Sequence, residues 1–124
     1  MKKNISVLIV EDEAFSALYL KTGLSGEGFN ICDTVATGEG AIDIAQNKDP
    51  DLILMDIRLA GRINGIEAAR KIHEKKKIPL IFTTGYDDLE LKMEALKLNP
   101  LAFLIKPVDI DELCVKISSA FNAD

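Results

Sequence analysis

Five side chains that can do chemistry together stand directly after apolar runs of the sequence. They are an acidic pair, a lone aspartate, a threonine and a lysine: Glu11 and Asp12, Asp56, Thr84, and Lys106. Three carboxylates with a reference pKa of about 4 repel one another at neutral pH, so they require protons, a cation or a basic partner. Carboxylate oxygens, often with a phosphate, are the ligands that Mg²⁺ prefers, whereas softer metals call for cysteine or several histidines. We therefore predict a Mg²⁺ site that handles phosphoryl groups.

Asp56 is the best candidate for a nucleophile in this set. It stands alone at the end of its apolar run, whereas Glu11 and Asp12 form an adjacent pair suited to holding an ion. An aspartate carboxylate can attack a phosphoryl group and form an acyl phosphate. The metal and the Lys106 ammonium would neutralise the phosphoryl oxygens, and the Thr84 hydroxyl would donate a hydrogen bond to one of them.

The elements that must position these residues are alternating strands and helices. Five apolar runs read as strands, at 5–10, 29–36, 51–55, 79–83 and 101–105. All but the second are nearly continuous, as a sheet covered on both faces requires. Strict alternation with right-handed crossovers predicts a doubly wound α/β domain with a parallel sheet. Ligands of such sheets bind beyond the carboxyl ends of the strands, which is where the five side chains stand.

Three of the intervening helices carry a repeated apolar face, which we expect to cover the sheet. These faces are Phe15, Leu18, Tyr19 and Thr22; Leu89, Met93 and Leu96; and Ile110, Cys114, Ile117 and Phe121. Three helix starts are marked by a capping residue that precedes a carboxylate by three positions. These pairs are Asn64 with Glu67, Asp87 with Glu90, and Asp109 with Glu112.

Length and composition exclude several classes of protein. The 124 residues, 48% of them hydrophobic, match one globular domain spanning 1–124. A formal charge of -5 argues against direct nucleic-acid binding and against attraction to anionic membranes. Cys32 and Cys114 lie far apart without metal-ligand spacing, so we expect no disulfide or zinc site and a cytoplasmic location. No apolar run is long enough to span a membrane.

Taken together, the motifs resemble the receiver domain of two-component response regulators, of the chemotaxis-receiver type. The resemblance covers essentially the whole chain, and its strength lies in four motifs in order: "VLIVEDE", "DLILMDIRL", "LIFTTGY" and "FLIKP". It implies a (βα)5 three-layer sandwich with a five-stranded parallel sheet in the flavodoxin-like order 2-1-3-4-5. It also implies a signalling protein of two-component phosphorelays and not an enzyme, since such a receiver catalyses only its own aspartyl phosphorylation and dephosphorylation.

The resemblance assigns roles to individual residues. Asp56 would accept a phosphoryl group from a sensor histidine kinase or a histidine phosphotransfer protein. Mg²⁺ would be held by Glu11, Asp12, Asp56 and the backbone carbonyl of Arg58. Thr84 and Phe103 would act as the switch pair, and Lys106 would bind the phosphoryl group, with a cis peptide bond to Pro107.

The resemblance also assigns an output surface, because in receivers the face built from the fourth helix, the fifth strand and the fifth helix contacts an output domain or a second copy. Here that face comes from the last three predicted elements, from residue 89 onward.

The sequence departs from the receiver pattern in the loop after Asp56, "IRLAGRINGIEAA". Leu59 and Ala60 replace the methionine and proline often found there, and the loop is longer by about one residue. Arg58 occupies a position that borders the phosphate in receivers, so we hypothesise that it modulates the lifetime of the phosphorylated state; a solvated arginine without such a role is the alternative.

Two other functions fit the same fold. A phosphorylation-independent interaction module would keep the receiver architecture, although such modules usually lack one or more of the acids. A flavodoxin-like flavin binder would need a phosphate-cradling first loop, and here that loop carries Glu11 and Asp12. Neither glycine-rich nucleotide-binding pattern is present, so we expect no residues that bind an organic cofactor.

Overall fold

The computed structural model describes residues 4–85 and 89–121 of the chain. Over these residues strands and helices alternate strictly. In chain order the elements are β1 (Ser6–Val10), α1 (Ala14–Gly26), β2 (Asn30–Val35), α2 (Gly38–Lys48), β3 (Leu52–Asp56), α3 (Gly65–Lys75), β4 (Leu80–Thr84), α4 (Leu89–Leu96), β5 (Ala102–Ile105) and α5 (Ile110–Phe121).

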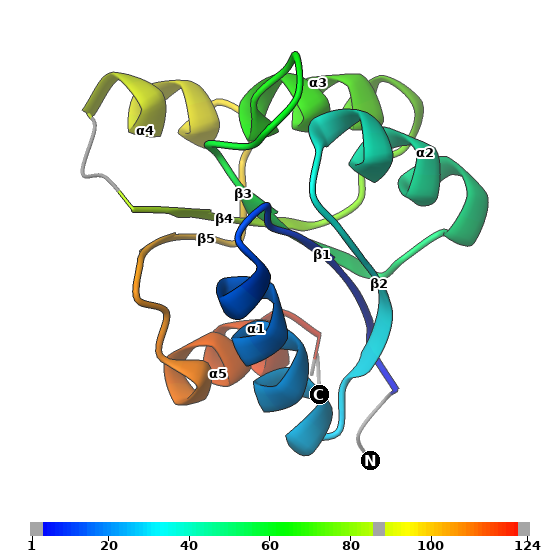
Figure 1. The fold of residues 1–124 in the computed structure, drawn as a ribbon, viewed down its shortest axis with the longest axis vertical. Helices are drawn as coiled ribbons and strands as arrows, with labels where there is room; N and C mark the ends of the chain where they lie inside the picture. Colours follow the sequence, from blue (N-terminus) through cyan, green and yellow to red (C-terminus); the bar gives the residue numbers. More distant parts are fainter. Residues whose placement is uncertain (1–3, 86–88, 122–124) are drawn as a thin grey trace.

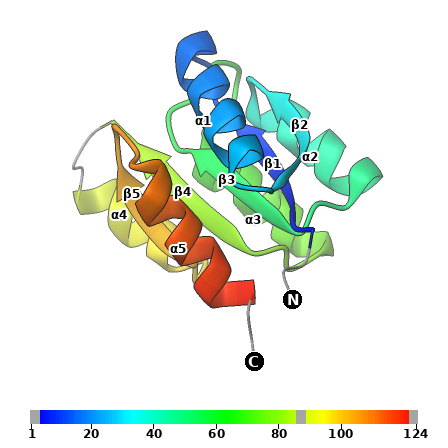
Figure 2. The ribbon, with the colours of Figure 1, turned by 90° about the horizontal axis from the view of Figure 1, so that it is seen from below.

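The five strands form one parallel sheet in the order β2-β1-β3-β4-β5. Figure 1 shows the three layers, with α2, α3 and α4 above the sheet and α1 and α5 below it. In the view from below, α1 and α5 lie across the same face of the sheet (Figure 2). The predicted doubly wound architecture and strand order are therefore confirmed. Because the chain winds in opposite directions from β1 and from β3, the carboxyl ends of these two strands border the crevice where such folds bind ligands.

Two apolar clusters fill the spaces on either side of the sheet. Leu8 and Val10 of β1 point into the cluster beneath α2, α3 and α4, whereas Val7 and Ile9 point into the cluster beneath α1 and α5. The side chains alternate across the sheet as in any strand, but both faces are covered, so both sets must be apolar. This burial explains the continuous apolar runs in the sequence.

The start of α3 is set by a reciprocal capping box, as predicted. Asn64 Oδ1 accepts a hydrogen bond from the Glu67 amide at 2.9 Å, and Glu67 Oε1 accepts one from the Asn64 amide at 2.8 Å. At the start of α5, Asp109 Oδ1 accepts a hydrogen bond from the Asp111 amide at 2.9 Å. The third predicted cap, at Asp87, lies outside the described residues.

The predicted face of α1 is wrong. Phe15, Leu18 and Tyr19 are 85%, 58% and 51% exposed, and the buried side chains of the helix are instead Leu20 and Leu24. Apolar residues occur on several sides of this helix, so their spacing alone does not select one face. The helix packs through a side that includes Gly23, where an added Cβ would lie 2.6 Å from Cδ1 of Ile110 in α5. A small residue there allows close approach to α5.

The predicted face of α4 is wrong as well. Leu89, Met93 and Leu96 are exposed, and α4 packs on the sheet through Ala95 and the half-buried Leu91. The predicted face of α5 is confirmed, because the core cluster contains Ile117 and is contacted by its other three members, Ile110, Cys114 and Phe121. None of the helices in the described ranges is long and apolar enough to cross a membrane.

Candidate functional site

The predicted site residues meet at the carboxyl ends of the central strands. Glu11 follows β1, Asp56 ends β3, Thr84 ends β4 and Lys106 follows β5. Glu11, Asp56 and Thr84 are buried, at 4%, 4% and 1% exposure, although two of them carry carboxylates. Buried ionisable groups are costly unless they are paired, so their position at the rim of the sheet calls for a partner.

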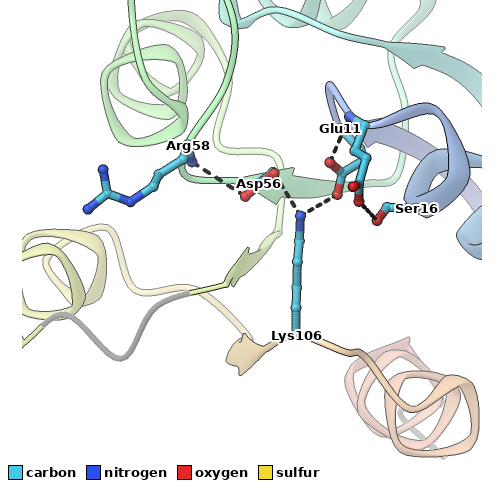
Figure 3. Close-up of polar contacts among 6 residues, drawn as sticks. Glu11, Ser16, Asp56, Arg58 and Lys106 are labelled. Atoms are coloured by element: carbon cyan, nitrogen blue, oxygen red, sulfur yellow. Dashed lines mark hydrogen bonds and ion pairs between the residues drawn. The ribbon is translucent and has the colours of Figure 1, made fainter.

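Lys106 supplies that partner to both buried carboxylates. Its ammonium nitrogen Nζ lies 2.6 Å from Glu11 Oε1 and 2.9 Å from Asp56 Oδ2. In Figure 3 the Lys106 side chain extends from the bottom of the view, and its nitrogen lies between Asp56 and Glu11. The other oxygen of Glu11, Oε2, accepts a hydrogen bond from the Glu13 amide at 3.0 Å, which fixes the orientation of the carboxylate.

Burial controls the protonation of Asp56 more strongly than its ion pair does. Desolvation, together with the nearby negative charge of Glu11, raises the pKa of Asp56 from 3.8 to about 6, although the hydrogen bond from Lys106 opposes this. For Lys106 the balance is the reverse: burial lowers its pKa, but the hydrogen bonds to Asp56 and Glu11 and the negative charges of these acids together raise the pKa overall. The site thus holds a firmly protonated lysine beside a carboxylate that ionises reluctantly.

The acidic residues have the donor set and spacing of a divalent-cation site. Glu11, Asp12 and Asp56 each offer a carboxylate oxygen, and these atoms lie within 4.8 Å of one another. Asp12 is exposed and the other two are buried, so one side of the cluster is open to solvent. An all-oxygen, largely anionic donor set with room for water fits Mg²⁺.

Arg58 lies next to the phosphoacceptor candidate through its main chain. Its amide donates a long hydrogen bond to Asp56 Oδ1 at 3.4 Å, whereas its side chain extends away from Asp56 (Figure 3). The backbone of Arg58 is therefore beside the acidic cluster, where its carbonyl was predicted to complete a metal shell. The guanidinium, which was hypothesised to border the phosphate, does not approach Asp56 in this conformation.

Thr84 and Phe103 lie on neighbouring strands of the sheet. Thr84 is in register with Ile105 of β5, and Phe103 is in register with Phe82 of β4. Phe103 is half-buried against the cluster beneath α4, and Lys92 Nζ of α4 lies 5.7 Å from its ring centroid. Of the predicted switch pair, Phe103 thus lies against α4, and Thr84 lies at the end of the neighbouring strand. The peptide bond between Lys106 and Pro107 is cis, as predicted.

Gly65 was not among the predicted site residues, although it packs against the backbone of Asp56. The first residue of α3 packs on the backbone of Asp56 so tightly that an added Cβ would overlap the Asp56 carbonyl and lie 2.9 Å from Met55 Cγ. The Gly65 amide donates a hydrogen bond to the Ile57 carbonyl at 2.8 Å. A glycine directly after the capping residue Asn64 was the available signal, since a helix start has no need of glycine there.

Tyr19 was predicted to cover the sheet and was not among the predicted site residues, but it joins α1 to the segment after Lys106. Its hydroxyl donates a hydrogen bond to the Val108 carbonyl at 2.9 Å. Beside this contact lies a hollow of about 280 Å³ that Phe15, Tyr19 and Pro107 line and that reaches Glu11 and Lys106. The exposed apolar side chains of α1 therefore border the acidic site.

The chain matches the family of response regulator receiver domains over residues 7–118. It is 34% identical to the transcriptional regulatory protein PdtaR of Mycobacterium tuberculosis over 116 residues, which are 94% of this chain and 56% of that protein. It is 37% identical to the response regulator ArlR of Staphylococcus aureus over 111 residues, which are 90% of this chain and 50% of that protein. The chain thus spans about half the length of these relatives.

Solved structures agree in fold and in sequence. The signal receiver domain of a modulated diguanylate cyclase from Desulfovibrio desulfuricans superposes with a TM-score of 0.90 and 34% identity, covering 97% of this chain and 95% of that one. The structure of the CheX-CheY-BeF3-Mg²⁺ complex from Borrelia burgdorferi gives a TM-score of 0.86 and 30% identity, covering 94% of this chain and 89% of that one.

Proposed function

Because the chain belongs to the family of response regulator receiver domains, we propose that residues 1–124 form one receiver domain whose phosphoacceptor is Asp56. The donor is the phosphohistidine of a sensor kinase or of a phosphotransfer protein. The observation that carries the proposal is the position of the Lys106 ammonium, which lies 2.9 Å from Asp56 Oδ2 and 2.6 Å from Glu11 Oε1 at the switch point of the sheet. An ion pair that only stabilises the fold needs one acid. Lys106 instead contacts two buried carboxylates, and a third carboxylate, that of Asp12, lies beside them.

The chemistry follows from the groups at the site. A carboxylate oxygen of Asp56 attacks the phosphorus atom, forming an O–P bond, while the donor's P–N bond breaks and its electron pair stays on the imidazole nitrogen, which takes up a proton. Lys106 then balances charge on the transferred phosphoryl group, and the Thr84 hydroxyl donates a hydrogen bond to one of its oxygens. Mg²⁺, held by Glu11, Asp12, Asp56 and the carbonyl of Arg58, would neutralise the remaining charge.

The added phosphoryl group acts as a switch. It brings a charge of about -1.5 to -2 and three acceptor oxygens to a site where the Lys106 ammonium already lies 2.9 Å from Asp56 Oδ2 and where Thr84 ends the neighbouring strand β4. Movement of Thr84 toward the phosphoryl group leaves space beside β5 and shifts the balance between positions of Phe103. The readout surface is the face of α4, β5 and α5, on which Met93, Ile105 and Val115 are 58%, 44% and 63% exposed. It serves an output domain or a second copy of the chain.

The phosphodonor docks on α1 beside the site. Phe15, Leu18 and Tyr19 are exposed apolar side chains next to the hollow that reaches Glu11 and Lys106. A partner helix seated there would bury apolar surface and bring its phosphohistidine to the open side of the acidic cluster.

Labelling with acetyl phosphate tests the proposal directly. Intact mass spectrometry in Mg²⁺ should show a labile gain of one phosphoryl group, which is absent in EDTA and absent in Asp56→Asn. Asp43→Asn, which removes an exposed carboxylate of α2, is the matched control and should label like the native chain. If the native chain gains no phosphoryl group and does not bind beryllofluoride, the proposal is wrong and a phosphorylation-independent interaction module takes its place.

A further inference from the structure

The loop between β3 and α3 is fastened to the start of α2. Thr37, the capping residue of α2, forms a parallel bridge with Ala60 of the loop. Two residues further along, the Arg62 amide donates a hydrogen bond to Glu39 Oε2 at 3.2 Å. Glu39 lies in the first turn of α2, where an acid also interacts favourably with the helix dipole. The loop that leaves the phosphoacceptor thus contacts an element that carries none of the predicted site residues.

Two glycines make this contact close. Gly61 has a φ of 98°, a left-handed conformation that favours glycine, and an added Cβ would lie 2.8 Å from Glu39 Oε1. Gly38 of α2 lies against the loop residue Ile63, where an added Cβ would lie 2.8 Å from Cγ1. The carboxylate of Glu39 therefore lies directly against the loop backbone at Gly61, and the loop packs on the start of α2 where Ile63 meets Gly38.

We propose that Glu39 is a positioning residue for the metal site. By holding Arg62 it keeps the β3–α3 loop in the conformation that places the main chain of Arg58 beside Asp56. This inference rests on the proposed function, because it concerns the Mg²⁺ ligand that Arg58 supplies there. The contact with Glu39 also offsets the length of the loop, which exceeds the common receiver pattern by about one residue. An extra residue adds conformational freedom, and a contact in the middle of the loop removes it.

The physical effect is preorganisation. The amide of Arg58 holds one end of the loop at Asp56, and the capping box at Asn64 holds the other. Without Glu39 the segment between these points would sample more conformations, and metal binding would have to order it again. The hydrogen bond between Arg62 and Glu39 is exposed to solvent, and one such bond corresponds to about a three- to tenfold change in an equilibrium constant.

The experiment combines Mg²⁺ calorimetry with amide hydrogen exchange. In Glu39→Ala we expect the Kd for Mg²⁺ to rise by about three- to tenfold and the Arg62 amide to exchange faster by a similar factor. Glu39→Gln retains an oxygen that can accept from Arg62, so it should restore both quantities most of the way. Asp43→Ala removes a charge from the same helix without touching the loop and should leave both unchanged. By reciprocity, saturating Mg²⁺ should slow exchange of the Arg62 amide in the native chain.

The outcomes separate this inference from the proposed function. If the native chain binds Mg²⁺ and Glu39→Ala binds it with the same Kd, Glu39 does not position the metal site. The same conclusion follows if Asp43→Ala weakens binding as much as Glu39→Ala does, because then only charge matters. If the native chain neither binds Mg²⁺ nor accepts a phosphoryl group, the proposed function itself fails.

Discussion

At the scale of single residues, the protonation of Asp56 links the site to stability. Its pKa rises from 3.8 to about 6 on folding, chiefly because the carboxyl is buried. A carboxyl whose pKa is raised by folding prefers to be neutral in the native state. The stabilisation that the raised pKa of Asp56 gives to the folded state is therefore complete below about pH 4 and is lost as the pH rises through about 6. At neutral pH, without a metal, the native state carries a costly buried charge.

Asp56→Asn should therefore stabilise the chain at neutral pH, because the amide cannot ionise. In EDTA at pH 7.5 we expect the free energy of unfolding to rise by about 1–3 kcal/mol, and at pH 4 we expect little change. Urea denaturation at both pH values measures this difference. Asp12→Asn, at the exposed member of the cluster, is the control and should change stability by less than about 0.5 kcal/mol. A stabilisation that is the same at both pH values would contradict the raised pKa.

At the scale of elements, helix ends and helix faces contribute differently to the site. The start of α3 places Gly65 against the backbone of Asp56, so the capping box at Asn64 also supports the position of Asp56. The face of α1 that points away from the core is apolar and borders the hollow beside Lys106. Thus α3 contacts the site through its first residue, whereas α1 borders the site through its exposed side.

Removing the α3 cap should destabilise the chain. Asn64→Ala loses the acceptor for the Glu67 amide, and we expect the free energy of unfolding to fall by about 0.5–2 kcal/mol. Asn64→Asp keeps an acceptor at the same position and should retain most of that stability. Chemical denaturation of the three proteins gives the comparison; equal losses in both variants would show that the side-chain cap is not the cause.

Polar substitution on α1 should affect transfer from a protein donor alone. Phe15→Ser removes an 85% exposed side chain, so stability should change by less than about 0.5 kcal/mol. If the donor buries this ring, transfer from a phosphotransfer protein should weaken about tenfold, while labelling by acetyl phosphate stays unchanged. Val115→Ser, at a 63% exposed apolar position of α5, is the matched control. Equal effects on both donors would argue against docking on α1.

At the scale of the whole molecule, the doubly wound sheet gathers side chains from distant parts of the sequence. Glu11 and Lys106 are 95 residues apart, yet their charged atoms lie 2.6 Å apart. The acidic cluster forms only when the sheet does, because its carboxylates come from the carboxyl ends of two different strands. A metal bound there binds the native state and not the unfolded chain.

Mg²⁺ should therefore raise the global stability. At a free concentration a hundred times the Kd, the free energy of unfolding should increase by about 2.7 kcal/mol, less whatever the unfolded chain binds. Thermal or urea denaturation in Mg²⁺ and in sodium chloride of equal ionic strength measures the difference. Asp12→Ala should lose most of the Mg²⁺ effect while keeping the response to sodium chloride. An equal Mg²⁺ effect in this variant would indicate that screening of the net negative charge, and not the site, stabilises the chain.

The sequence by itself determined the order of strands and helices and the identity of the chemical groups. Buried parallel strands must be apolar along their whole length, so the runs ending before Glu11, Asp56, Thr84 and Lys106 are visible without a structure. Polar residues at which such an apolar run ends must lie at the rim of the sheet, where the strand itself ends. These constraints are local along the chain, and they were sufficient to predict a doubly wound parallel α/β domain with the site residues at one edge. The order of the strands was predicted from the resemblance to receiver domains.

Only the tertiary structure decided which surfaces those elements bury and how the site is supported. The helices α1 and α4 carry apolar residues on more than one side, and packing through Gly23 and Ala95 turned Phe15 and Met93 outward. The support of the loop by Glu39 also depends on a backbone conformation that is reached only after folding. Close contacts between segments far apart in the sequence leave no periodic signal, because nothing in the spacing of residues along one segment records the shape of another.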